Sequence, residues 1–321
     1  MTERVATGAL GPAEGFADDY EALRHGVGAV PLGRDVVRIA GPDAVEYLQG
    51  QCSQDIAALV IGTSADALLL TPQGKLDALV RVTRVGDDDL YLDVDAGYGP
   101  AVVARLSHFK LRVKADITAL DWTCVALRGP AASGVATGLD PAPGTSFMAN
   151  FAWGAVVGVD LLGAGPELPE GVRRCGADAW QAVRVEAGIP VMGAELDDRT
   201  IAAEAGLLER CVSFTKGCYT GQELVARLDA RGNKVARRLR GIVMDPSTGD
   251  ARAVGSGAEV AVGDRVVGKV TSVAWAAALE APVALAYLHR AVEPPCPVEI
   301  RTGDPATGVV AAEARILPLI D

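Results

Sequence analysis

The arrangement of short apolar runs and turn signals between residues 67 and 94 constrains the fold of this chain more than any other feature. Strand-like runs cover residues 67–70, 76–85 and 90–94. They are separated by two turn signals, Pro72-Gln73-Gly74 and Gly86-Asp87-Asp88-Asp89. Such residues favour tight reversals, so the three runs predict an antiparallel meander. A helical spacing follows over residues 101–109. This mixture lacks a strict βαβ alternation, which favours an α+β fold over a parallel doubly wound sheet.

Two segments combine a strand with a Gly-Pro turn. Residues 35–39 precede Gly41-Pro42 and a helix expected over residues 43–48, and residues 123–127 precede Gly129-Pro130 and an Ala-rich stretch. Either an internal duplication or two strands that end in a common turn explains this pair. Beyond it, one strand is expected between residues 128 and 176, at 155–161, followed by a helix over 178–187.

After Arg240 the pattern changes to short apolar runs between glycine turns, as in residues 259–262 and 265–273. This pattern predicts a third, all-β part of barrel type. A chain of 321 residues accommodates three domains. We expect a first α/β domain over residues 1–120, a second over 121–240 and a C-terminal β-barrel over 241–321, with boundaries that need not be continuous in the chain.

The composition narrows the partners and the compartment. The formal net charge of −11 disfavours nucleic acid and anionic membranes as partners. The first residues lack the pattern of a signal peptide, and no apolar run approaches the roughly 20 residues that span a bilayer. Six cysteines without a C-x-x-C pair predict free thiols in a reducing compartment. We therefore expect a cytoplasmic protein without membrane contact. The three histidines show no ligand spacing, so no metal site is expected.

The segment VSFTKGCYTGQE, residues 212–223, has the character of a functional loop. Gly217 and Gly221 permit tight turns on both sides of Cys218, and the charge of Lys216 would favour a thiolate there. Cys218 is therefore a candidate reactive thiol. The alternative is a buried structural cysteine, which is the common environment of this residue type.

A local reversal of charge follows this loop. Residues 227–240 contain six arginines and lysines and a single acid, Asp229. Arginine side chains suit carboxylates and phosphates, so the stretch favours a small polyanionic ligand over a long nucleic acid. A solvated charged face is the alternative.

Residues 216–223, KGCYTGQE, resemble the signature K-G-C-[FY]-x-G-Q-E of the YgfZ-type proteins at every fixed position. Further similar stretches cover residues 41–56, 69–78, 183–196 and 225–241. YgfZ-type proteins are relatives of the glycine cleavage T-protein, an aminomethyltransferase, and are implicated in tetrahydrofolate-dependent assembly or repair of iron-sulfur proteins. The resemblance implies two related α/β domains and a C-terminal antiparallel β-barrel around a central folate channel.

The resemblance also implies roles for individual residues. Glu186, within Arg184-Val185-Glu186-Ala187-Gly188, resembles the glutamate that holds the pterin ring, and Arg184 is expected beside it. Cys218 corresponds to the cysteine on which YgfZ function is thought to depend, with Lys216 as its neighbour. The other expected folate-binding residues are Tyr219, Gln222 and Glu223 of the loop, and Arg227, Arg237 and Arg238 for the glutamyl tail.

One departure bears on the activity. In the T-protein an aspartate follows an Asn-Ala-Gly strand end by a few residues, whereas Asp95-Ala96-Gly97 is followed by no carboxylate through Val102. We therefore expect a protein that binds tetrahydrofolate or a one-carbon-substituted folate and serves iron-sulfur client proteins through Cys218. The alternatives are a folate-dependent aminomethyl or methyl transferase and a non-catalytic folate-binding scaffold.

Overall fold

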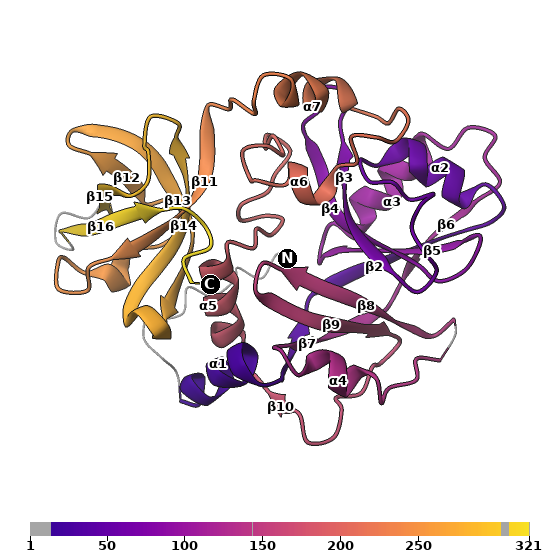
Figure 1. Ribbon diagram of the computed structural model, residues 1–321, viewed down its shortest axis with the longest axis horizontal. Coiled ribbons are helices and arrows are strands. Elements are labelled where there is room, and N and C mark those ends of the chain that lie inside the picture. The colour runs from indigo at the N-terminus through magenta and orange to yellow at the C-terminus, as the bar shows by residue number, and fades with distance from the viewer. Residues whose placement is uncertain (1–13, 143, 303–307, 321) are drawn as a thin grey trace.

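The computed structural model describes residues 14–142, 144–302 and 308–320. Its strands form two five-stranded sheets and one closed barrel (Figure 1). The expected α+β fold with a C-terminal antiparallel barrel is therefore confirmed. None of the helices in the described ranges is long and apolar enough to cross a membrane.

The first sheet contains the meander that the turn signals predict. Its strands, in spatial order, are β3 (Ser64–Leu70), β4 (Leu76–Arg84), β5 (Asp89–Asp95), β2 (Arg34–Ala40) and β6 (Asp116–Leu120). All neighbouring strands in it are antiparallel. Helices α2 (Ala44–Gln51) and α3 (Gly99–His108) pack on the sheet through apolar residues such as Leu48 and Leu106. The buried residues of these strands and helices form a core of their own.

The second sheet is built from strands that precede and strands that follow the first sheet in the chain. Its spatial order is β10 (Arg173–Arg174), β1 (Gly28–Leu32), β7 (Thr123–Arg128), β9 (Val156–Gly163) and β8 (Ser146–Trp153). Because β1 pairs with β7, residues 28–32 belong to this sheet although they precede the first sheet in the chain. A short helix, α4 (Ala132–Ala136), covers it.

The expectation of one strand between residues 128 and 176 was wrong, because β8 and β10 lie there as well as β9. Strand β8 has a weak apolar alternation, with Phe147 and Ala149 buried between partly exposed residues. Its pairing with β9 along its whole length stabilises the strand despite this weak alternation. Both Gly-Pro turns do link a strand to a helix, β2 to α2 and β7 to α4, and the duplication stays a prediction.

The barrel closes in the order β11 (Arg237–Met244), β14 (Ala281–His289), β13 (Arg265–Ala276), β12 (Glu259–Val262), β15 (Cys296–Arg301) and β16 (Val309–Arg315). Short 3-10 turns at Ala251–Ala253 and Ala277–Leu279 connect its strands. Strand β11 begins at Arg237, so the barrel takes in residues before position 241. The exact domain boundaries stay a prediction.

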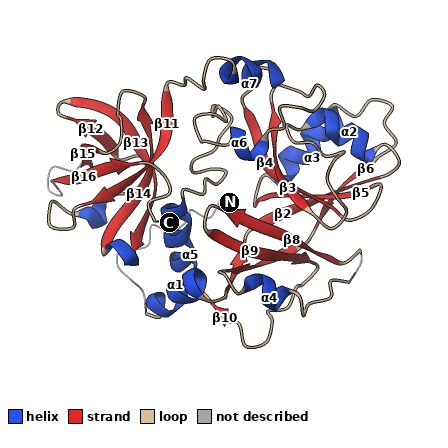
Figure 2. Ribbon diagram, viewed as in Figure 1, coloured by secondary structure: helices blue, strands red, loops and turns tan. Residues whose placement is uncertain are grey.

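Two helices join the second sheet to the barrel, as Figure 2 shows. Helix α1 (Phe16–His25) contacts α5 (Ala177–Ala187), and α5 contacts barrel strands β13 and β14. Helices α6 (Leu208–Cys211) and α7 (Gln222–Asp229) lie in the segment that leads to the barrel. The largest apolar core spans all three parts, with members such as Leu70, Val183 and Val283. Helix α5 is therefore central to the packing of the whole chain.

Candidate functional site

Glu186 is a fully buried carboxylate on α5. The Tyr20 hydroxyl donates a hydrogen bond of 2.9 Å to Glu186 Oε2, whereas the buried Oε1 has no hydrogen-bond partner. Burial raises the pKa of Glu186 to about 7, although Tyr20 and Arg24 both favour the ionised form. A buried acceptor without a partner is rare in folded proteins, which makes Oε1 the candidate acceptor for an N–H donor of a ligand.

The end of α5 fixes the position of Glu186. Gly188 follows the helix with a φ of 70°, a left-handed conformation that glycine adopts without strain. A Cβ at Gly188 would lie only 2.8 Å from Leu317 of the C-terminal segment. The Leu319 backbone N–H also donates to the Glu186 carbonyl at 2.7 Å. The glycine of the RVEAG motif therefore lets the C-terminal segment pack on this end of α5.

Arg184, the other residue expected from this motif, is engaged in hydrogen bonds within the protein. Its guanidinium bonds the Ile189 carbonyl at 2.7 Å, Glu195 Oε2 at 3.0 Å and Ser272 Oγ at 2.6 Å. Its Nε donates to Gln181 at 3.0 Å. Both Arg184 and Glu195 are buried. Arg184 thereby ties α5 to the following loop and to barrel strand β13.

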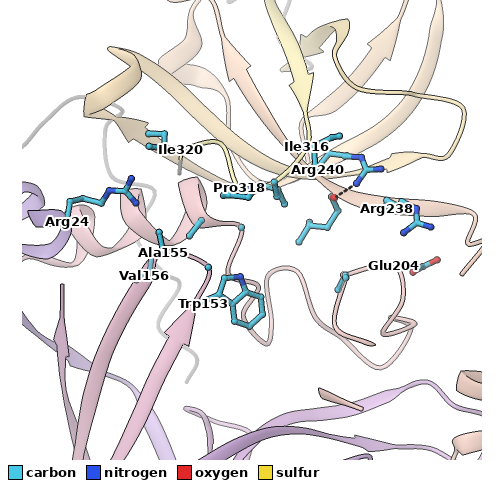
Figure 3. Close-up of a pocket in the computed structure, with 17 residues that line it drawn as sticks. Arg24, Trp153, Ala155, Val156, Glu204, Arg238, Arg240, Ile316, Pro318 and Ile320 are labelled. Carbon is cyan, nitrogen blue, oxygen red and sulfur yellow. Dashed lines mark hydrogen bonds between the residues drawn. The ribbon is translucent and has the colours of Figure 1, made fainter. Parts of the chain in front are cut away.

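A cavity of about 260 Å³ lies where the end of α5 meets the second sheet and the barrel (Figure 3). Its wall comes from α1, the β8–β9 turn, the end of α5, the loop at residues 204–206, β11 and residues 316–320. Trp153 contributes an aromatic side chain, Arg24, Arg238 and Arg240 contribute cations, and Glu204 contributes one carboxylate. The cavity therefore combines apolar walls with positive charge beside the helix that carries Glu186.

Neither Arg238 nor Arg240 has an ion-pair partner within the described part of the chain. Arg238 donates to the Asn233 carbonyl at 2.6 Å, and Arg240 donates to the Leu239 carbonyl at 3.3 Å. The buried Arg240 Nε has no acceptor. Burial, and then the charge of Arg238, lower the pKa of Arg240. Two neighbouring cations without a carboxylate form a site that suits an anion.

The other two arginines expected at the glutamyl tail lie differently. Arg237 Nε lies 3.0 Å from Glu204 Oε2 in an ion pair. Its guanidinium carbon lies over the Tyr287 ring, 4.4 Å from the ring centroid. Arg227 is exposed on α7 and does not line this cavity. Of the three, only Arg238 therefore lines the cavity. Arg240 was not singled out from the sequence, although the basic stretch contains it.

A second cavity, of about 170 Å³, lies between the two sheets, and Trp153 lines both cavities. A network of ion pairs beside this cavity links the sheets. The pairs are Arg34 with Asp93 and Asp95, Arg81 with Asp93 and Asp160, and Arg128 with Asp160. No sequence pattern predicted this network, because its members come from five different strands or their ends. These charges neutralise one another inside the molecule.

The KGCYTGQE loop lies apart from Glu186. Cys218 is exposed, as expected for an accessible thiol and unlike the buried alternative. Glu223 is exposed, Gln222 accepts a hydrogen bond from the Tyr219 backbone at 3.2 Å, and burial raises the pKa of Tyr219 to about 12. No residue from 213 to 223 lines either cavity. Glu186 itself is fully buried and also lines neither cavity, so the structure does not bring Cys218 and Glu186 together in one cavity.

Lys216 does not contact Cys218 through any described hydrogen bond. Its Nζ instead donates to the backbone carbonyls of Gln49, Cys52 and Gln54. Burial lowers the pKa of Lys216. The lysine of the motif thus faces the end of α2.

Comparisons with known proteins agree with the fold and the motif. Residues 12–165 match the GCVT N-terminal domain, and residues 237–321 match the glycine cleavage T-protein C-terminal barrel domain. An aminomethyltransferase of Nostoc sp. is 28% identical over 324 residues, which cover 89% of this chain and 84% of that protein. The tRNA-modifying protein YgfZ of Edwardsiella ictaluri is 29% identical over 215 residues. That match covers 61% of this chain and 65% of the relative.

A solved structure shares the fold. The crystal structure of the glycine cleavage system aminomethyltransferase T from Bartonella henselae superposes with a TM-score of 0.80 at 22% identity, covering 98% of this chain and 95% of that one. The sheets, the barrel and these matches define the class: the chain belongs to the glycine cleavage T-protein superfamily. Within it the chain fits the YgfZ type. Membership supports a folate-binding role.

Proposed function

We propose that the chain binds tetrahydrofolate or a one-carbon derivative and acts in the assembly or repair of iron-sulfur proteins, with Cys218 as the reactive thiol. The observation that carries the folate part is the buried, unpartnered Oε1 of Glu186. A carboxylate can accept two N–H bonds from the amidine edge of a pterin. When bound, the folate supplies a carrier for a one-carbon unit.

The charged end of the ligand also has a partner. Arg238 and Arg240 line the cavity beside α5 and have no carboxylate partner among the described residues. Because arginine binds carboxylates through paired N–H groups, these two are the best candidates for the glutamyl tail. Arg237 already pairs with Glu204, so its part would be to orient that acid beside the cavity.

The iron-sulfur part of the proposal rests on the KGCYTGQE motif and on the exposure of Cys218. An exposed thiol outside the cavities is accessible to a client protein as well as to small molecules. This arrangement favours chemistry between Cys218 and an external partner over transfer of a one-carbon unit to Cys218 inside a cavity. The client proteins are unidentified, and a cytoplasmic location stays a prediction.

Aminomethyl transfer is less well supported. The Asp95 carboxylate is held on both oxygens, by Arg34 at 2.5 Å and by the Met192 backbone N–H at 2.9 Å. The next residues through Val102 carry no acid. A general acid or base needs a carboxylate that can exchange protons with the substrate, and Asp95 is committed to structural contacts.

Replacement of Cys218 by serine separates the reactive thiol from the scaffold. Serine keeps the size of the side chain but supplies no thiolate near pH 7, so Cys218→Ser should fold and bind folate. It should fail to restore iron-sulfur enzyme activity in cells that lack the native protein. Restoration equal to that by the unmodified chain would favour the non-catalytic scaffold.

The folate part is tested independently of Cys218. Calorimetric titration of the purified chain with tetrahydrofolate and its 5-formyl form should give a dissociation constant in the micromolar range or below. Failure to bind at near-millimolar folate, with the protein shown to be folded, would contradict the proposal.

A further inference from the structure

Lys216 forms a hydrogen-bonded clamp between the Cys218 loop and the end of α2. Its Nζ lies 2.5 Å from the Gln49 carbonyl, 2.8 Å from that of Cys52 and 2.9 Å from that of Gln54. An ammonium group has three N–H donors, and here each has a carbonyl acceptor. These carbonyls lie at or just beyond the C-terminal end of α2, where the helix dipole places partial negative charge.

Further hydrogen bonds join the same two segments on both sides of Lys216. The Ser213 backbone donates to the Ser53 carbonyl at 3.0 Å, and the Thr220 backbone donates to the Gly50 carbonyl at 3.3 Å. Ser53 Oγ also donates to the Cys211 carbonyl at 2.5 Å. These hydrogen bonds therefore hold the loop from 211 to 220 against residues 49–54.

Cys218 lies in the short span between the residues that this clamp holds. It lies between two anchors, the Lys216 ammonium and the Thr220 backbone, and both it and Gly217 are exposed. A Cβ placed on Gly217 would meet no atom within 4 Å, so the space beside Gly217 is open, whereas Tyr219 packs against the largest apolar core. Anchors on either side restrict where the sulfur can go without covering it.

We infer that Lys216 is a positioning residue, which holds the loop against the end of α2 so that Cys218 is presented to an external partner. The inference rests on the proposed role of Cys218. It differs from the role that proximity in the sequence suggests, because the donors of Lys216 are directed to backbone carbonyls and not to the thiol. The charge of Lys216 is thereby used to offset the partial charges at the end of α2.

The test compares Lys216→Met with the unmodified protein by two measurements. Methionine keeps an unbranched apolar stem but removes all three donors. Hydrogen exchange of the backbone amides of residues 52, 53, 219 and 220, which donate hydrogen bonds, reports the clamp. The pH midpoint of Cys218 alkylation, followed on its own peptide by mass spectrometry, reports thiol activation. Lys75→Met is the matched control, since Lys75 is exposed on the neighbouring β3–β4 turn and its side chain makes no described hydrogen bond.

Lys216→Met should raise exchange at these amides roughly ten- to hundredfold, the factor expected for a lost charge-assisted hydrogen bond, and leave the alkylation midpoint unchanged. Lys75→Met should change neither. A shifted alkylation midpoint, or unchanged exchange, in Lys216→Met would overturn the inference. If that variant does not fold, Lys216→Arg carries the same test: it keeps the charge, but a planar guanidinium cannot direct three donors to three converging carbonyls. Both measurements are independent of folate binding and of complementation, so their failure is distinct from failure of the proposed function.

Discussion

At the residue scale, Glu186 imposes a cost on the ligand-free fold. Its pKa is raised by burial to about 7 in the folded chain, whereas an unfolded glutamate titrates near its ordinary value, about 4.3. Between these values the folded state binds more protons than the unfolded state. The free energy of unfolding therefore falls as pH rises through this window, by up to about 4 kcal/mol from this group.

Glu186→Gln should remove this pH dependence. Glutamine has nearly the shape of glutamate but does not titrate, so the unmodified chain should lose up to about 3 kcal/mol more than the variant between pH 5 and pH 8. Urea denaturation at the two pH values measures the difference. Glu21→Gln, which changes an exposed glutamate next to Tyr20, should follow the unmodified chain. Parallel profiles for Glu186→Gln and the unmodified chain would show that Glu186 is ionised without cost.

Local sequence motifs predict some of the candidate site residues but not the groups that these residues contact. RVEAG and KGCYTGQE identify Glu186 and Cys218 because each motif is contiguous in the chain. The Tyr20 hydroxyl that bonds Glu186 lies 166 residues away, and the carbonyls that Lys216 bonds lie more than 160 residues away. Such contacts arise from the packing of the parts, so proximity in sequence suggested a partner for Lys216 that the folded chain does not use.

At the scale of elements, α5 presents different residues to different neighbours. Glu186 meets Tyr20 of α1, whereas Arg184 reaches Glu195 and barrel residue Ser272. The sequence predicted this helix almost to its ends, as residues 178–187 against Ala177–Ala187. Its apolar spacing is local information. The sequence could not predict that Arg184 would contact the barrel, because its acceptors lie on separate segments.

Arg184→Met should lower the free energy of unfolding by about 3 to 5 kcal/mol, because it leaves the buried Glu195 carboxylate without its cation. Arg184→Met combined with Glu195→Gln should recover part of that loss, since the buried charge is removed as well. Chemical denaturation of the two single variants and the double variant measures the coupling. Strictly additive losses would mean that the pair does not act as a unit.

At the scale of the whole molecule, the larger cavity depends on the second sheet, on α5 and on the barrel. The second sheet supplies Trp153, α5 supplies Gly188, and the barrel with its following segment supplies Arg238, Arg240 and Leu317. Glycine turns and short strands predicted the barrel, and the meander predicted the first sheet. The meeting of the parts could not be predicted, because it depends on side chains that are distant in the sequence.

Arg238→Leu combined with Arg240→Leu should weaken a polyglutamylated folate more than the monoglutamate, by roughly tenfold, since charge-assisted bonds to the tail are lost. The salt dependence of the former should flatten. Titration of both ligands at two salt concentrations measures this. Arg227→Leu, at an exposed position outside both cavities, should have little effect. A larger effect of Arg227→Leu would place the tail along α7 instead.

Calorimetric titration of tetrahydrofolate into the unmodified chain and into Glu186→Ala tests most directly whether Glu186 holds the pterin. Loss of a charged hydrogen-bonding partner should weaken binding by about 2 to 4 kcal/mol, while the exposed control Glu21→Ala binds as the unmodified chain does. Equal affinity of Glu186→Ala and the unmodified chain, with both proteins folded, would contradict the assignment of this carboxylate to the folate.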